Sequence, residues 1–117
     1  MTSSNVKRHN VTYDPDAVVE LLAVKSKQEH RALVNAVEKL RELGERLEPP
    51  HMKPLQGVAG SALCELRPRR GDSDWRAIYR RVGNFFVILA IDRHKNFATM
   101  VERAQHRAGR YGSHLES

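Results

Sequence analysis

Cysteine, aromatic side chains and long apolar runs are all scarce in this sequence of 117 residues. A single cysteine excludes an internal disulfide framework. The absence of an apolar signal segment and of any run of about 18 apolar residues argues against a membrane partner and favours a cytoplasmic location. The length suits one domain whose core needs no disulfide or metal. We therefore expect a single domain over residues 1–117, with 113–117 as a frayed tail.

Metal-ligand spacings are lacking as well. The six histidines follow neither an H-x-x-H nor an H-E-x-x-H pattern. Cys64 has no second cysteine or histidine nearby at ligand spacing, so it is expected to be a small buried hydrophobic residue. We expect no metal and no cofactor.

Positive charge is present in excess. The formal net charge is +6 and the isoelectric point about 9.9. From residue 59 onward, eleven Lys or Arg stand against six Asp or Glu, which is +5 of that total. Such an excess raises affinity for polyanions whatever the fold. Nucleic acid or an acidic protein is the partner class that this composition favours.

Helical patterns dominate the first half of the chain after a short β-favouring run over residues 6–14. Asp14 followed by Pro15 predicts the start of a short helix through residues 16–24. Ser26 and Glu29 form an S-x-x-E capping box, and apolar residues at helical spacing predict a second helix over 27–47. With almost no linker between them, the two helices are expected to form an α-hairpin.

The second half has the period of strands. After a proline-rich loop, residues 62–68 and 75–82 alternate apolar and polar side chains, and 84–91 are almost continuously apolar. Short turns predict an antiparallel meander, with a final helix from Asn96 to Tyr111. We therefore predict a small α+β domain of order β-α-α-β-β-β-α. One face of its twisted antiparallel sheet lies under helices and the other is free.

The order of several motifs carries a family resemblance. The pieces "LQG", "ALCELRP", "WRAIYRR" and "VERAQHRAGRY", with a basic cluster at the end of the apolar strand, resemble the RelE/HigB superfamily of type II toxins, in its phage-derived HigB-like branch. The resemblance runs from about residue 13 to 111. It implies a RelE-like domain that cleaves mRNA on the ribosome and inhibits translation. It also implies neutralisation by an antitoxin, often a helix-turn-helix protein.

The chemistry can be argued from the residues as well. Metal-independent RNA cleavage requires a base for the 2′-hydroxyl, cations for the phosphate charge and an acid for the leaving oxygen. Arg67 and Arg76, expected on adjacent strands, are predicted phosphate clamps. His94 and Lys95 are predicted to supply the acid or base. The predicted RNA-binding residues are Arg69, Arg70, Arg80, Arg93, Arg107 and Tyr111.

Other interpretations remain open at this stage. Surface arginines often serve only solubility, Tyr111 has the spacing of a core residue, and Glu65 is better suited to orient an arginine by a salt bridge than to act as a base. A gyrase-poisoning ParE-like toxin would share the architecture without the strand-end basic and imidazole groups. A non-catalytic RNA-binding or antitoxin-partner module would use the same charge for phosphates alone.

Overall fold

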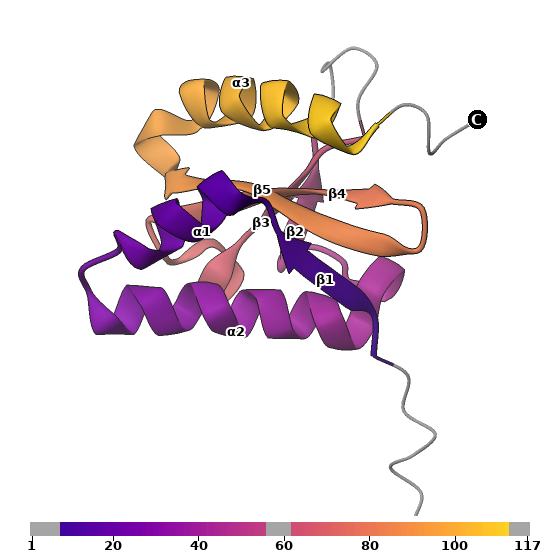
Figure 1. Cartoon of the computed structure of the whole chain (residues 1–117). Helices are drawn as coiled ribbons and strands as arrows, with labels where there is room; N and C mark the ends of the chain where they lie inside the picture. Colours follow the sequence, from indigo (N-terminus) through magenta and orange to yellow (C-terminus); the bar gives the residue numbers. More distant parts are fainter. Residues whose placement is uncertain (1–7, 56–61, 113–117) are drawn as a thin grey trace, which may run out of the picture.

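The fold is described by a computed structural model that covers residues 8–55 and 62–112 (Figure 1). The predicted frayed tail, 113–117, lies outside the described residues. Along the chain follow β1 (Asn10–Tyr13), α1 (Pro15–Leu22), α2 (Lys27–Leu43), η2 (Gly44–Arg46), β2 (Met52–Pro54), β3 (Cys64–Leu66), η3 (Pro68–Gly71), β4 (Trp75–Val82), β5 (Phe85–Arg93), η4 (His94–Asn96), α3 (Phe97–Ala108) and η5 (Gly109–Tyr111). The elements η2, η4 and η5 are single 3₁₀ turns, and η3 is interrupted by a kink at Arg69 and Arg70.

The five strands form one sheet in the order β1-β5-β4-β3-β2. The predicted meander of β3, β4 and β5 is confirmed, and so is the edge position of the N-terminal strand. Two details of the prediction were wrong. β1 runs parallel to β5, because the two helices that follow it carry the chain across the sheet. A fifth strand, β2, forms within the segment that was predicted to be a loop, and it pairs with β3.

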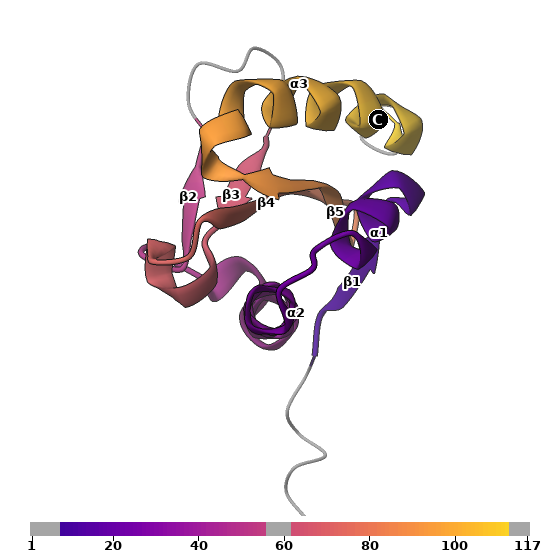
Figure 2. The same ribbon diagram turned by 90° about the vertical axis from the view of Figure 1, so that its left-hand side faces the viewer.

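Helices cover both faces of the sheet. The views at right angles show α2 beneath the sheet, α3 above it and α1 beside β1 and β5 (Figures 1 and 2). Residues of α1 and α2 share one core cluster with the sheet, and residues of α3 share a second. The expectation of one free face was therefore wrong. The continuous apolar run of β5 is explained, because Val87, Ile88 and Leu89 are all fully buried while pointing alternately to the two faces.

The predicted helix starts are confirmed in the structure. Asp14 caps α1 by accepting from the backbone N–H of Asp16 at 2.9 Å, with Pro15 at the first helical position. Ser26 Oγ accepts from the backbone N–H of Glu29 at 3.2 Å at the start of α2. The Glu29 carboxylate, however, accepts from Ser73 Oγ at 2.6 Å and so ties α2 to the loop before β4.

The end of α2 depends on a glycine. Gly44 has a φ of +55°, and a Cβ there would lie 2.5 Å from the His9 ring. Both the backbone conformation and the close approach of His9 require glycine at this position. Among the helices of the described segments, none combines the length and the apolar character needed to cross a membrane.

Candidate functional site

Most of the predicted catalytic residues lie at one end of the sheet. β3 and β5 are both antiparallel to β4, so their C-terminal ends lie at the same end. Arg67 follows β3, Arg93 ends β5, and the turn after β5 carries His94 and Lys95. We call the residues exposed or half-buried at this end the sheet-end surface: Arg67, Arg69, Arg70, Trp75, Arg93, His94 and Lys95.

The η3 turn gives this surface two of its arginines. Arg69 and Arg70 adopt φ angles of +54° and +60°, in the left-handed region that non-glycine residues rarely occupy. Such a conformation persists only where surrounding contacts enforce it. Here the buried guanidinium of Arg76 holds the loop by donating to the carbonyl oxygens of Ser73 (2.5 Å) and Gly71 (3.2 Å).

Arg76 is not exposed as the sequence analysis expected. Only 5 % of its surface is accessible. Its Nε donates to Glu65 Oε2 at 3.0 Å, and Nη1 also donates to the carbonyl oxygen of Trp75 at 2.8 Å. The placement of Arg76 as an open phosphate clamp was therefore wrong, because the η3 loop folds over its head group. The predicted salt bridge from Glu65 to one of the two arginines is confirmed.

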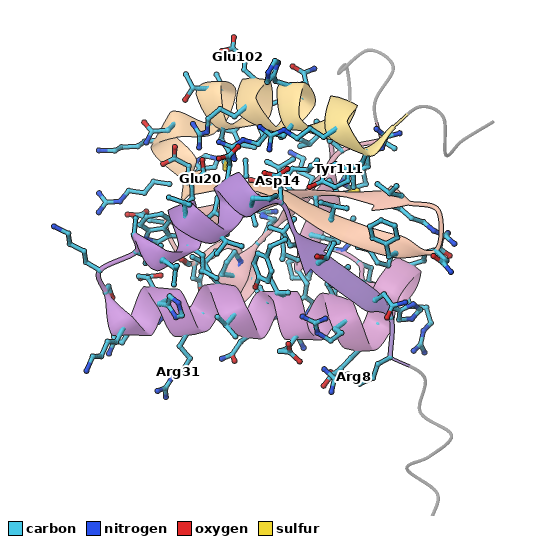
Figure 3. The ribbon with its side chains drawn as sticks, in the orientation of Figure 1. Arg8, Asp14, Glu20, Arg31, Glu102 and Tyr111 are labelled. Atoms are coloured by element: carbon cyan, nitrogen blue, oxygen red, sulfur yellow. The ribbon has the colours of Figure 1, made fainter. Side chains whose placement is uncertain are left out.

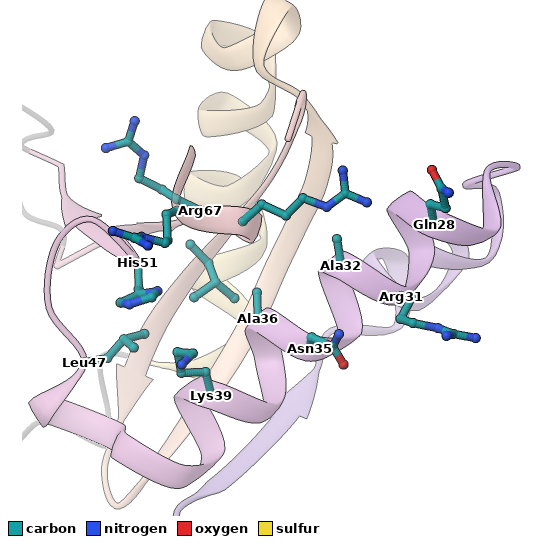
Figure 4. A pocket seen from close by; sticks show the side chains of 12 residues that line it. Gln28, Arg31, Ala32, Asn35, Ala36, Lys39, Leu47, His51 and Arg67 are labelled. Carbon is teal, nitrogen blue, oxygen red and sulfur yellow. The ribbon is translucent and has the colours of Figure 1, made fainter. Parts of the chain in front are cut away.

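Arg67 differs sharply from Arg76. Its side chain is half-buried, and its buried Nε has no hydrogen-bond partner within the described part of the chain. A Cβ on Gly71, whose φ is +98°, would lie 2.9 Å from Arg67 Nη2, so glycine leaves room for the guanidinium. The backbone N–H of Arg67 donates to the carbonyl oxygen of His51 at 2.9 Å. Of the two predicted clamps, Arg67 is the one with donor capacity to spare (Figure 4).

The turn after β5 is held firmly at both sides. The backbone N–H of His94 donates to the carbonyl oxygen of Asp74 at 2.6 Å. Asp92 Oδ1 accepts from the backbone N–H of Arg93 at 2.7 Å and from Asn96 Nδ2 at 2.9 Å. Asn96 thus occupies the predicted cap position of α3 but directs its side chain to Asp92. These contacts present His94 and Lys95 to solvent on a fixed backbone.

Asp92 is the anchor of this turn. Partial burial would raise the pKa of its carboxyl, but hydrogen bonds from Asn96, the Arg93 backbone and Arg103 outweigh that effect and hold the pKa below its usual value. Arg103 of α3 donates to Asp92 Oδ2 at 3.1 Å. The carboxylate is therefore charged at neutral pH and ties the turn to α3.

Arg93 lies over an aromatic ring. Its guanidinium carbon is 5.4 Å from the centroid of the Trp75 ring, and the two residues are directly opposite in the β4–β5 ladder. Both line a shallow hollow that also includes Lys25 from the turn between α1 and α2, and Glu29. Because Glu29 also pairs with Arg69 at 3.9 Å, this hollow is continuous with the η3 arginines.

A second pocket of about 390 Å³ adjoins the sheet-end surface on the α2 side (Figure 4). Its floor is formed by Ala32, Ala36, Leu47 and Leu66. Around the floor stand cationic and imidazole side chains, which are Arg31, Lys39, His51, Arg67, Arg69 and Arg70. Sequence reasoning missed Arg31, Lys39 and His51. The spacing of Arg31, Asn35 and Lys39 along α2 was the available signal, since residues four apart lie on one helix face.

Two predicted RNA-binding residues are engaged in contacts within the fold. Arg107 is 9 % exposed and donates to Glu20 (2.8 and 3.0 Å) and to the Leu89 carbonyl oxygen (2.9 Å), so its placement on an RNA-binding surface was wrong. Tyr111 donates its hydroxyl to the buried Asp14 at 2.8 Å (Figure 3). Burial and this hydrogen bond raise the pKa of Tyr111 to about 12. The alternative of a packing role for Tyr111 is confirmed.

Arg80 lies along β4, away from the sheet end. It is opposite Val87 in the β4–β5 ladder, on the face that α3 covers. The structure therefore brings Arg67, Arg69, Arg70, Arg93, His94 and Lys95 to one surface and leaves Arg80, Arg107 and Tyr111 elsewhere. Within the described ranges, no group of three or more His, Cys, Asp or Glu could hold a metal ion.

The fold is that of the RelE toxins. The structure of Escherichia coli toxin RelE, solved as a double mutant in the free state, aligns with 82% of this chain and 97% of its own, with a TM-score of 0.58 and 15% sequence identity. The chain belongs to the family described as "Phage derived protein Gp49-like (DUF891)", whose model matches residues 20–107. The RelE/HigB-type resemblance of the sequence is thereby confirmed. A search of curated proteins finds no match.

Proposed function

We propose that this chain is the toxin of a type II toxin–antitoxin system and inhibits translation as a metal-independent endonuclease of ribosome-bound mRNA in the cytoplasm. One observation carries the proposal: six basic or imidazole side chains stand on segments that lie at the same end of the sheet, and the Nε of Arg67 has no hydrogen-bond partner among the described residues. Family membership and the RelE-like fold support it.

The reaction needs only groups that this surface offers. The 2′-oxygen of a nucleotide loses its proton and attacks the adjacent phosphorus, the bond to the 5′-oxygen breaks, and that oxygen takes up a proton. We assign the stabilisation of the negative charge on the phosphate to Arg67, since a guanidinium donates two parallel hydrogen bonds to phosphate oxygens. We assign the two proton transfers to His94 and Lys95. An imidazole can take and give protons near neutral pH, and an ammonium group can donate one.

The remaining residues of the surface bind RNA in this proposal. Arg69, Arg70 and Arg93 contact phosphates on either side of the cleaved bond. Arg76 is a positioning residue, because its hydrogen bonds hold the η3 loop that carries Arg69 and Arg70. The ribosome supplies the alignment of the substrate, so few catalytic groups are sufficient.

Induced expression in bacteria tests the proposal. We expect growth arrest, with new mRNA 5′ ends inside codons of translated messages and no such ends when translation is blocked by an initiation inhibitor. A His94→Ala variant, whose exposed side chain contributes little to packing, should express at the same level without cutting. Growth arrest with DNA damage and intact mRNA would instead indicate a ParE-like toxin. Normal growth with RNA binding would indicate a non-catalytic module.

A further inference from the structure

The α2 groove is the pocket of about 390 Å³ that lies between α2 on one side and Leu47, His51 and residues 66–70 on the other, and its charge pattern is not one that RNA cleavage requires. Every charged residue that lines it is basic, and no Asp or Glu is among the lining residues. Arg31 and Lys39 stand on the α2 side and Arg67 stands opposite (Figure 4), where the η3 turn also contributes Arg70. The groove therefore attracts an anionic partner along both of its walls.

The floor of the groove is apolar and has the period of a helix. Ala32 and Ala36 are one turn apart on α2 and carry the smallest side chains that a helix face can offer beside glycine. Leu47 and Leu66, both buried in the core, complete the floor. The α2 side of the groove runs from Gln28 to Lys39, which is about 17 Å at 1.5 Å per residue, or about three helical turns.

We propose that the α2 groove is the docking site for an acidic amphipathic helix of the neutralising partner protein. Apolar side chains at positions i, i+4 and i+7 of that helix pack on Ala32, Ala36 and Leu66. Carboxylates on its two flanks pair with Arg31 and Lys39 on one wall and with Arg67 and Arg70 on the other. That the partner neutralises this chain rests on the proposed function. That the bound segment is an acidic amphipathic helix rests on the lining of the groove alone.

The lining favours a peptide over RNA. Base recognition in single-stranded RNA relies on stacking against flat side chains. The flat groups of the lining, the His51 ring and the arginine guanidinium planes, stand around the floor, and the floor itself is aliphatic and offers a base no ring to stack on. Small alanines instead permit the close approach of a second helix.

Occupation of the groove has a direct consequence for the sheet-end surface. Arg67 belongs to both, so a helix whose carboxylates pair with the Arg67 guanidinium occupies a donor that the sheet-end surface would offer to phosphate. The partner then competes with phosphate for the same donor. Neutralisation requires no change in the fold of the toxin.

A synthetic peptide titration tests the docking site. The probe is a lactam-stapled helix of about 14 residues with leucine at i, i+4 and i+7 and glutamate on both flanks. It is added to the ¹⁵N-labelled full chain, and binding is followed by NMR. We expect amide shifts concentrated on Arg31, Asn35, Lys39, Leu66 and Arg67. A peptide of the same composition in scrambled order keeps the charge but loses the apolar stripe and should not produce them.

Variants separate the floor from the walls. Ala36→Phe fills the floor without changing charge and should weaken binding by about tenfold or more. Lys39→Glu reverses one wall charge and should weaken it by a similar factor, more at low than at high salt. Gln105→Glu, which adds a negative charge to an exposed position of α3 on the opposite side of the sheet, should leave affinity unchanged. Unfolding midpoints confirm that each variant is folded.

The outcomes are decisive and independent of nuclease activity. Shifts in the groove that both groove variants abolish support the docking site, even if the chain proves non-toxic. The absence of binding, equal binding of the scrambled peptide, or shifts confined to the α3 side would overturn it. The same would follow if a single-stranded RNA oligonucleotide, and not the peptide, gave the shifts in the groove.

Discussion

Arg76 Nε donates to Glu65 Oε2 at 3.0 Å, and each of these two side chains is only 6 % exposed. The pair joins β4 to β3 beneath the η3 loop, and the other Arg76 donors close that loop. A buried ion pair contributes little net stability over an apolar pair, but breaking it leaves an uncompensated charge.

The first prediction follows from that asymmetry. Arg76→Met should lower the free energy of unfolding by about 3–5 kcal/mol, since the Glu65 carboxylate then remains buried and alone. Glu65→Leu/Arg76→Met removes both charges and should cost less than Arg76→Met. Urea unfolding at pH 7 measures both. A double variant that is less stable than Arg76→Met would show that the pair itself stabilises the fold.

The second prediction concerns the sheet-end surface. Arg67→Ala should reduce mRNA cleavage by about 100-fold, as expected when one donor to a transition-state oxyanion is lost. Because the Nε of Arg67 has no partner among the described residues, stability should change by less than about 0.5 kcal/mol. Single-turnover cleavage on programmed ribosomes gives the rate, with Arg81→Ala as the exposed control. Unchanged cleavage by Arg67→Ala would remove it from the site.

The third prediction is a pH dependence. Since the pKa of Asp92 is lowered in the folded chain, its contribution to stability is complete above the ordinary value of 3.8 and is lost as the pH falls through the folded pKa. Asp92→Asn should therefore cost about 1 kcal/mol at pH 7 and almost nothing near pH 2. Thr99→Val removes a neutral hydrogen bond in the same turn, to the Asn96 carbonyl oxygen. Its cost should not vary with pH, whereas a constant cost for Asp92→Asn would contradict the role assigned to the carboxylate.

The fourth prediction concerns the three tyrosines. Burial raises the pKa of Tyr13 and, with the nearby Cys64, of Tyr79, and burial with the Asp14 hydrogen bond raises that of Tyr111 to about 12. A raised pKa means that the stability held by each phenol is present below pH 10 and is lost as the pH rises through the folded value. Absorbance at 295 nm should therefore change only above pH 10 in native protein, but near pH 10 in urea. Identical native and unfolded curves would contradict the burial of the hydroxyls.

The elements that local chemistry determines could be predicted from the sequence. Asp14, Ser26 and the short turn between β4 and β5 act within a few residues, and each lies where the pattern indicated. The strand β2 could not be found this way, because its three residues end in Pro54 and are too few to show an alternation, and the strand forms only by pairing with β3. The almost continuous apolar run of β5 already indicates that both faces of the sheet are covered, although the alternating neighbours favoured a single covered face.

The candidate site was predictable in composition but not in burial. Arg67 and Arg76 look alike in sequence, and only the left-handed turn at Arg69 and Arg70 folds the chain over one and leaves the other accessible. Arg107 was misassigned for a related reason. Its acidic partner, Glu20, is 87 residues away in the chain, and no local pattern reports such a pair.

Asp14, near the start of the chain, is bonded by residues near its end, and this has a consequence for folding during synthesis. This carboxylate has no exposed surface, and its side-chain partners Arg110 and Tyr111 follow it by 96 and 97 residues. A ribosome adds residues from the N-terminus, so Asp14 leaves the exit tunnel long before either partner exists. Before that point, docking of α1 on the sheet would bury the Asp14 carboxylate without these two partners, which costs free energy. Docking of the first helix on the sheet therefore becomes favourable only once residues 110 and 111 are available, which couples the start of the fold to its end.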